Sequence, residues 1–162
     1  LLKQSVILLL YMFNIKTLIL LVLILHAVIV FPAGHGIGFL IFAELFWLPQ
    51  FYGVGTEDFS IAITDPLSQT IGFIALLSLV GQLILLGSVL LYNSKRTILI
   101  QFVGLVLLWT AYAYLSVSLF TGKEIQISFV TGLPFFVASL SLTFKLIRQW
   151  VGFSRKSSVE HT

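Results

Sequence analysis

The sequence predicts an all-α integral membrane protein with four transmembrane helices and a short interfacial or re-entrant helix between the first and the second. Hydrophobic residues make up 59% of its 162 residues and charged residues only 9%, whereas about a quarter of the residues in a soluble domain are charged. The apolar residues are grouped in runs whose lengths suit a bilayer. We therefore expect one transmembrane domain, residues 1–153, followed by a disordered basic cytoplasmic tail, residues 154–162.

The four spans are placed by the length of each apolar run and by the residues that interrupt it. Asp65 and Pro66 precede the second run, and these residue types suit the N-cap and the first position of a helix. Pro134 lies early in the fourth run, where it predicts either a kink or a later helix start. The spans are expected at about 17–37, 67–92, 97–120 and 127–150.

Basic residues predict how the chain is threaded through the membrane. If the chain crosses four times, eight of the nine basic residues fall on one side, and only Lys123 falls on the other. Cytoplasmic loops carry the excess of lysine and arginine, so both termini are expected in the cytoplasm. The eight residues are Lys3, Lys16, Lys95, Arg96, Lys145, Arg148, Arg155 and Lys156.

A long connection between the first two spans contains the predicted interfacial helix, at about 38–48. Glu44 is its only charged residue, and we expect this side chain at the headgroup boundary. The segment either caps the bundle and extends the first span, or forms a surface that responds to the membrane or to a ligand on the outer side. The aromatic face that would bury in lipid or against neighbouring spans consists of Phe39, Phe42, Phe46 and Trp47.

Few residues suggest chemistry. His26, His35 and Glu44 are spaced nine residues apart, which does not place them on one helical turn, so no metal site is predicted. No buried acid is expected to accompany a histidine, so we expect neither an enzyme nor a cofactor. An ionisable residue within a span is a candidate functional group. The alternative for His26 is a neutral imidazole that bonds to a neighbouring helix.

Small and polar residues form stripes along the second and third spans. Small residues allow helices to approach closely, and amides and hydroxyls bond across such contacts. These stripes either pack the bundle of one chain, face a second copy of the chain in a homo-oligomer, or line a narrow polar pathway. They consist of Ser78, Gly81, Gln82 and Ser88 in the second span, and of Gln101 and Gly104 in the third.

Six of the basic residues form a rim on the cytoplasmic face. Such a rim attracts anionic lipid, or it docks an acidic cytoplasmic protein. Direct binding of nucleic acid is not expected, because these loops are too short to present a large basic surface. The rim consists of Lys95, Arg96, Lys145, Arg148, Arg155 and Lys156.

A short, cysteine-free, four-span chain without catalytic residues resembles the membrane subunit of bacterial defence systems, in particular the Kiwa anti-phage system. The resemblance is one of architecture, and it implies an inner-membrane oligomer that senses infection and works with a cytoplasmic DNA-binding partner. The predicted function is a non-enzymatic sensor or scaffold subunit that signals to a cytoplasmic protein. The alternative is a channel or pore-forming protein lined by Gln82, Ser88 and Gln101.

Overall fold

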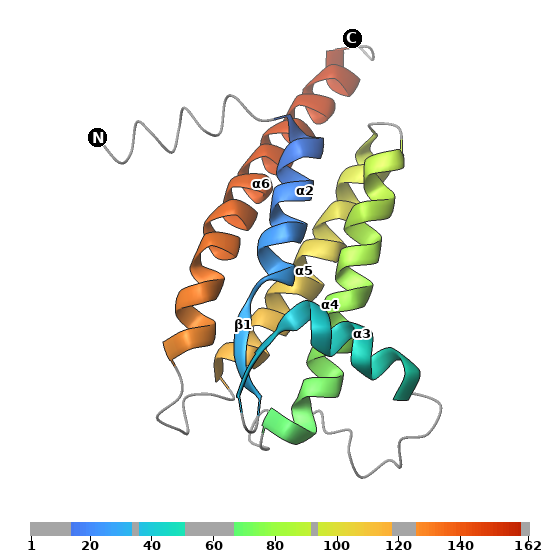
Figure 1. Cartoon of the computed structure of the whole chain (residues 1–162). Helices are drawn as coiled ribbons and strands as arrows, with labels where there is room; N and C mark the ends of the chain where they lie inside the picture. Colours follow the sequence, from blue (N-terminus) through green and yellow to red (C-terminus); the bar gives the residue numbers. More distant parts are fainter. Residues whose placement is uncertain (1–13, 34–35, 51–66, 92–93, 118–125, 160–162) are drawn as a thin grey trace, which may run out of the picture.

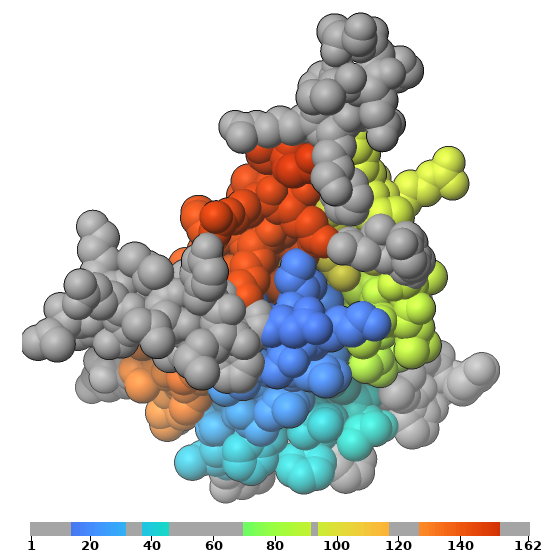
Figure 2. All heavy atoms as spheres, turned by 90° about the horizontal axis from the view of Figure 1, so that it is seen from above, coloured from blue at the N-terminus to red at the C-terminus, as the bar shows by residue number. Residues whose placement is uncertain are grey.

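A computed structural model of the chain describes residues 14–33, 36–50, 67–91, 94–117 and 126–159 (Figure 1). Long helices form a bundle, and a β-hairpin followed by a shorter helix lies toward one end of it. Figure 2 shows the bundle from above, with α2 lying between α6 and α4. In chain order the elements are α2 (Ile15–Ala27), β1 (Val30–Ala33), β2 (Gly36–Phe39), α3 (Leu40–Gln50), α4 (Leu67–Leu90), α5 (Lys95–Val117) and α6 (Gln126–Val159).

Three of the described helices are long and apolar enough to cross a membrane, which supports the predicted class of helical multi-pass membrane protein. They are Thr70–Leu90, Lys95–Ser116 and Ile127–Gly152. Many of their large apolar side chains point outward, as in Leu90, which is 88% exposed. An outward apolar surface of this kind suits lipid rather than water.

The first predicted span differs from the structure. The helix α2 ends at Ala27, after 13 residues, and β1 and β2 follow it as an antiparallel hairpin in which Val30 pairs with Phe39. Pro32 lacks the amide hydrogen that a continuing helix needs. Gly38 lets the ring of Phe31 lie across it, because a Cβ atom there would be 2.9 Å from the Phe31 Cζ. The expected helix over 17–37 is therefore a short helix plus a hairpin.

Neighbouring elements hold the hairpin against the bundle. The backbone amide of Val30 donates to the Thr131 hydroxyl of α6 at 3.2 Å. The amide of Leu40 donates to the carbonyl oxygen of Ile29 at 2.9 Å and so closes the base of the hairpin. Non-helical backbone is tolerated at membrane depth only where protein or internal water satisfies its polar groups, and these two bonds meet that requirement at the base of the hairpin.

Two glycines bring α4 and α5 together within one chain. A Cβ atom at Gly81 would lie 3.0 Å from the carbonyl oxygen of Gly104, and a Cβ atom at Gly104 would lie 2.8 Å from the Leu85 Cγ. Gly87, also on α4, has open space at the same position. This part of the small-residue stripe therefore packs α4 on α5 internally, which is one of the alternatives that the sequence left open.

Polar bonds and aromatic contacts join α5 to α6. The Trp109 indole donates to the Ser139 hydroxyl at 2.8 Å, and the Tyr112 hydroxyl donates to the Phe129 carbonyl oxygen at 3.0 Å. Gly132 faces the Tyr112 ring so closely that a Cβ atom would lie 2.1 Å from its Cε2. The α5–α6 contact thus depends on a small residue beside a large ring.

The helix α6 is longer than the predicted fourth span and begins before Pro134, which lies inside it. The later start that Pro134 permitted is therefore wrong. Residues 154–159 of the tail that was expected to be disordered are helical, because α6 continues to Val159. Asp65 and Pro66, which were expected to begin the second span, lie outside the described residues.

The described basic side chains gather at one end of the bundle. The start of α2, the α4–α5 connection and the C-terminal end of α6 lie at the same end (Figure 1). Lys16 is near the first of these, Lys95 and Arg96 begin α5, and Arg148 lies toward the end of α6. This arrangement agrees with the one-sided distribution of basic residues that the sequence predicts.

Candidate functional site

Four polar side chains from three helices meet inside the bundle, and we call them the polar cluster. They are His26 in the last turn of α2, Glu44 of α3, and Ser78 and Gln82, which lie one turn apart near the middle of α4. His26 and Ser78 are 0% exposed and Glu44 is 3% exposed. Burial of so many polar groups costs free energy unless they bond to one another.

The bonds within the polar cluster converge on Glu44 and Ser78. The Gln82 amide donates to Glu44 Oε1 at 2.9 Å, and the Ser78 hydroxyl donates to the same oxygen. Ser78 Oγ lies 3.1 Å from His26 Nδ1, and Gln82 Nε2 lies 3.3 Å from that nitrogen. Glu44 of α3 is thus held by two donors that belong to α4.

The hydrogen count of Ser78 limits its role in the polar cluster. A serine hydroxyl has one hydrogen to donate and two lone pairs to accept with. Since this hydrogen is donated to Glu44, Ser78 Oγ offers only lone pairs to His26 Nδ1. In the tautomer with a hydrogen on Nδ1, His26 donates to Ser78; in the other tautomer, Nδ1 accepts from the Gln82 amide.

The other nitrogen of His26 is left without a partner. His26 Nε2 is buried and has no hydrogen bond within the part of the chain that the structure describes. The imidazole meets the edge of the Phe135 ring of α6, with the ring centroids 4.6 Å apart. A buried polar atom without a hydrogen bond in an apolar setting is destabilising.

The hairpin is the element that creates the polar cluster. The helix α2 runs along the bundle to Ala27, and the chain then reverses through β1 and β2 before α3 begins at Leu40. The reversal returns Glu44 to the depth of His26, although the two residues are 18 positions apart. Helix α3 packs on α4, which places Glu44 beside Ser78 and Gln82.

These positions correct two expectations. Glu44 is buried against α4 rather than at the headgroup boundary, because Ser78 and Gln82 provide donors that the headgroup layer would otherwise supply. His26 has a buried acid nearby, whereas the sequence spacing suggested none. The reason is the hairpin after Ala27: nine-residue steps along a continuous helix would not bring His26 and Glu44 together, whereas the chain reversal does.

The aromatic residues of the predicted interfacial helix do not form one helical face. Phe39 ends β2 and is 42% exposed, while Phe42 of α3 is 50% exposed. Their rings contact each other at 6.1 Å between centroids. Phe46 and Trp47 belong to α3 by their backbone, and their side chains lie outside the described part.

The polar cluster contains serine, histidine and glutamate, in an order that differs from that of a catalytic triad. In a catalytic triad the histidine lies between the nucleophile and the acid, and each of its nitrogens bonds to one of them. Here Ser78 lies between His26 and Glu44, and only Nδ1 of the histidine is engaged. The hydrogen bonds of the polar cluster join α2 and α3 to α4.

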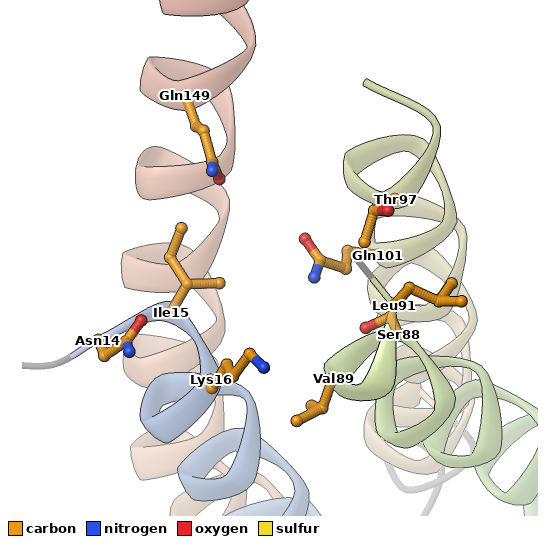
Figure 3. Close-up of a pocket in the computed structure, with 9 residues that line it drawn as sticks. All are labelled: Asn14, Ile15, Lys16, Ser88, Val89, Leu91, Thr97, Gln101 and Gln149. Carbon is orange, nitrogen blue, oxygen red and sulfur yellow. The ribbon is translucent and has the colours of Figure 1, made fainter. Parts of the chain in front are cut away.

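The remaining stripe residues lie elsewhere. Ser88 and Gln101 line a cavity at the end of the bundle where α2 begins, shown in Figure 3. Fully buried apolar residues fall between the cavity lining and the polar cluster along the helices: Ile19 and Val22 on α2, and Leu85 on α4. The stripe therefore contributes to three different places: the cluster, the cavity and the α4–α5 contact.

The rim residues are distributed over two helices. Lys95, Arg96 and Arg148 are exposed, and Lys145 is half-buried on α6. Arg155 and Lys156 belong to α6 by their backbone, and their side chains lie outside the described part. The rim is thus an exposed basic surface at the same end of the bundle as the cavity.

Among the described residues, no group of three or more His, Cys, Asp or Glu side chains is placed to hold a metal ion. His35, which the sequence considered together with His26 and Glu44, is outside that set. Comparison of the chain with protein-family models, curated proteins and solved structures gives no match.

Proposed function

We propose that this chain is a non-enzymatic sensor subunit of the inner membrane that responds through the segment from Val30 to Gln50 and signals to a cytoplasmic protein. The proposal includes four crossings of the membrane and both termini in the cytoplasm, with α2 and the hairpin together making the first crossing. It also includes a homo-oligomer in the bilayer. Anti-phage defence is the setting that the resemblance to the Kiwa membrane subunit implies.

The observation that supports this proposal is the burial of Glu44 against α4. A carboxyl group inside an apolar bundle is stable there only while donors satisfy it. The hydroxyl of Ser78 and the amide of Gln82 are those donors. Loss of either bond favours a second state in which α3 leaves α4 and Glu44 reaches water at the outer face. Two such states are what a sensor requires.

The lipid-facing side of the same segment supplies a site for the stimulus. Phe39 and Phe42 point away from the bundle, and their exposed rings suit the acyl and headgroup region. A change in outer-leaflet packing alters the free energy of these rings and so shifts α3 between its two states. Helix α4 then connects Gln82 to the basic end of the bundle, because Lys95 and Arg96 begin the next helix, α5, shortly after α4 ends.

The test uses a single introduced thiol, because the chain has no cysteine of its own. Ala43→Cys places it on α3 at a side chain that is 7% exposed, and an impermeant maleimide is applied to intact cells. We expect slow labelling. Adding Gln82→Leu should raise the labelling rate roughly tenfold or more, since an unsatisfied buried group costs about 1–3 kcal/mol. The matched control adds Ser88→Ala to Ala43→Cys instead. Because Ser88 lies outside the polar cluster, the labelling rate should stay slow.

The same impermeant maleimide tests the orientation of the chain in the membrane. Glu57→Cys should be labelled in intact cells, and Thr162→Cys should be labelled only after the membrane is permeabilised. Labelling of Thr162→Cys in intact cells contradicts the cytoplasmic tail. If Gln82→Leu leaves the labelling of Ala43→Cys unchanged, α3 is not held by the polar cluster and the sensing mechanism is wrong.

A channel is the second candidate function, and one observation favours it. The polar side chains of Gln82, Ser88 and Gln101 all face the interior, in the polar cluster and in the cavity. The buried apolar layer around Leu85 separates the two polar regions, so conduction requires that layer to open. Proton flux in liposomes that contain the purified protein and a trapped pH-sensitive dye tests this candidate. Flux that Gln82→Leu suppresses supports a channel, and no flux rules against it.

A further inference from the structure

We propose that the cavity at the basic end of the bundle binds a phosphate group, carried by an anionic lipid of the adjacent leaflet. The cavity has a volume of about 180 Å³ and lies between α2, α4, α5 and α6. A single ordered water needs only a small part of such a volume, so a phosphate group fits. The inference is independent of the sensor proposal, because none of the residues of the polar cluster lines this cavity.

Donors dominate the polar lining of the cavity. Figure 3 shows the ammonium group of Lys16 and the amides of Gln101 and Gln149 directed into the space between α2 and α6 on one side and α4 and α5 on the other. Asn14 is the N-cap of α2, yet its side chain makes no capping hydrogen bond, so its amide remains for a ligand. An anion is the ligand that accepts from all four groups.

Gln101 is the strongest single indication of a ligand. Its side chain is 6% exposed, and its amide points into the cavity (Figure 3). Within the described part of the chain no hydrogen bond satisfies this amide. The hydroxyls nearby are engaged, since Ser88 donates to the Leu85 carbonyl oxygen at 2.6 Å and Thr97 bonds Ser94 at 3.0 Å. The amide faces the cavity without a protein partner there, so its hydrogens are available to a bound acceptor.

The electrostatics of the cavity favour negative charge. The first turn of α2 is at its edge, and the free backbone amides at the start of a helix attract anions. Of the six acidic residues in the sequence, Glu44 alone falls within the described ranges, and it belongs to the polar cluster. No described carboxylate therefore competes for Lys16. Lys16 and Asn14 are exposed at the mouth of the cavity, Gln149 is half-buried and Gln101 is buried. Donors that include one cation and no acid match phosphate rather than a metal ion.

The apolar part of the lining identifies a lipid as the carrier. Ile15, Val89 and Leu91 complete the wall, and Leu90 beside them is 88% exposed on the outer surface of α4. A headgroup phosphate in the cavity would leave acyl chains along this apolar surface. Basic pockets between helices on the cytoplasmic side are a recurrent type of site for anionic headgroups.

The test measures retention of phosphatidylglycerol by the full-length protein, using native mass spectrometry of protein released from nanodiscs that contain phosphatidylglycerol and phosphatidylcholine. We expect Lys16→Gln and Gln101→Leu each to reduce retained phosphatidylglycerol several-fold. Lys95→Gln removes the same charge at the same end of the bundle, from an exposed side chain that does not line the cavity, and should change retention little. Retention of phosphatidylcholine should be low in all variants.

The outcomes separate the possible explanations. Equal losses in Lys16→Gln and Lys95→Gln, with none in Gln101→Leu, indicate general attraction to the basic rim and overturn the proposal. Equal retention of both lipids indicates an apolar groove and also overturns it. Inorganic phosphate is the second probe: if it raises the melting temperature of delipidated wild type but not of Gln101→Leu, while lipid has no effect, the cavity binds a free anion and the lipid assignment is wrong.

Discussion

Gly104→Leu is expected to separate α4 from α5 and to lower the melting temperature of the protein strongly. A Cβ atom added at this position would lie 2.8 Å from Leu85 Cγ and 3.1 Å from the carbonyl oxygen of Gly81. The second of these is backbone and cannot turn aside, so the helices must move apart. Overpacking typically costs about 1–3 kcal/mol, and a shift of two backbones places the expected cost at the upper end of that range.

Gly87→Leu is the matched control for this substitution. Gly87 lies on the same helix, and nothing lies within 4 Å of its added Cβ atom. Since leucine has the higher helix propensity, this variant should keep or slightly raise the melting temperature. Circular dichroism in mild detergent measures the melting, and native mass spectrometry measures the number of copies per particle.

The two measurements together decide what the glycine stripe does. A fall in melting temperature for Gly104→Leu, with the effect present in monomeric particles, means that the stripe packs one chain. An unchanged melting temperature together with loss of assembly would place Gly104 between copies, contrary to the contact with Gly81. In that case the proposed homo-oligomer would assemble through the Gly104 face of α5. If Gly104 packs on α4 within one chain, the homo-oligomer must assemble through a different face.

Substitution of Glu44 and Gln82 is expected to produce strongly non-additive losses of stability. Glu44→Ala leaves the Gln82 amide and the Ser78 hydroxyl without their acceptor, and each unsatisfied buried group costs about 1–3 kcal/mol. Gln82→Leu leaves Glu44 with Ser78 as its remaining donor. In the double variant Glu44→Ala with Gln82→Leu, the same broken hydrogen bond is counted once instead of twice. Its loss of unfolding free energy should therefore be smaller than the sum of the two single losses by about 0.5–3 kcal/mol.

A conservative variant distinguishes a polar contact from packing. Glu44→Gln retains a side-chain oxygen that can accept from Gln82 and Ser78, so we expect it to lose less stability than Glu44→Ala. Denaturation of the protein in nanodiscs, followed by tryptophan fluorescence, gives the free energies. Additive losses, or a Glu44→Gln variant as unstable as Glu44→Ala, would mean that Glu44 does not depend on these two donors.

Membrane class and the three long helices could be predicted from the sequence, because both depend on local hydropathy. The limits of α4 and α5 fall within three residues of the predicted spans, since each run is predominantly apolar and charged or turn-forming residues flank it. A span needs about 20 consecutive predominantly apolar residues. A one-dimensional pattern is therefore sufficient for these elements.

The hairpin was not predicted, although Pro32, Gly36 and Gly38 interrupt the apolar run. A strand and a helix segment of four apolar residues look alike in hydropathy. What stabilises the hairpin is contact with distant elements, such as the bond between Val30 and Thr131, 101 residues apart. Information of that kind is absent from a local pattern.

The sequence by itself determined that this is a helical membrane protein with basic residues at one end, and it identified His26, Glu44, Ser78 and Gln82 as separate polar residues. The tertiary structure alone decided that they meet, because their association depends on a chain reversal of which the sequence shows only the breaks. It likewise decided that Gly81 and Gly104 face each other and that Gln101 enters a cavity. Partners across helices are fixed by how the helices pack, and packing is a property of the whole bundle.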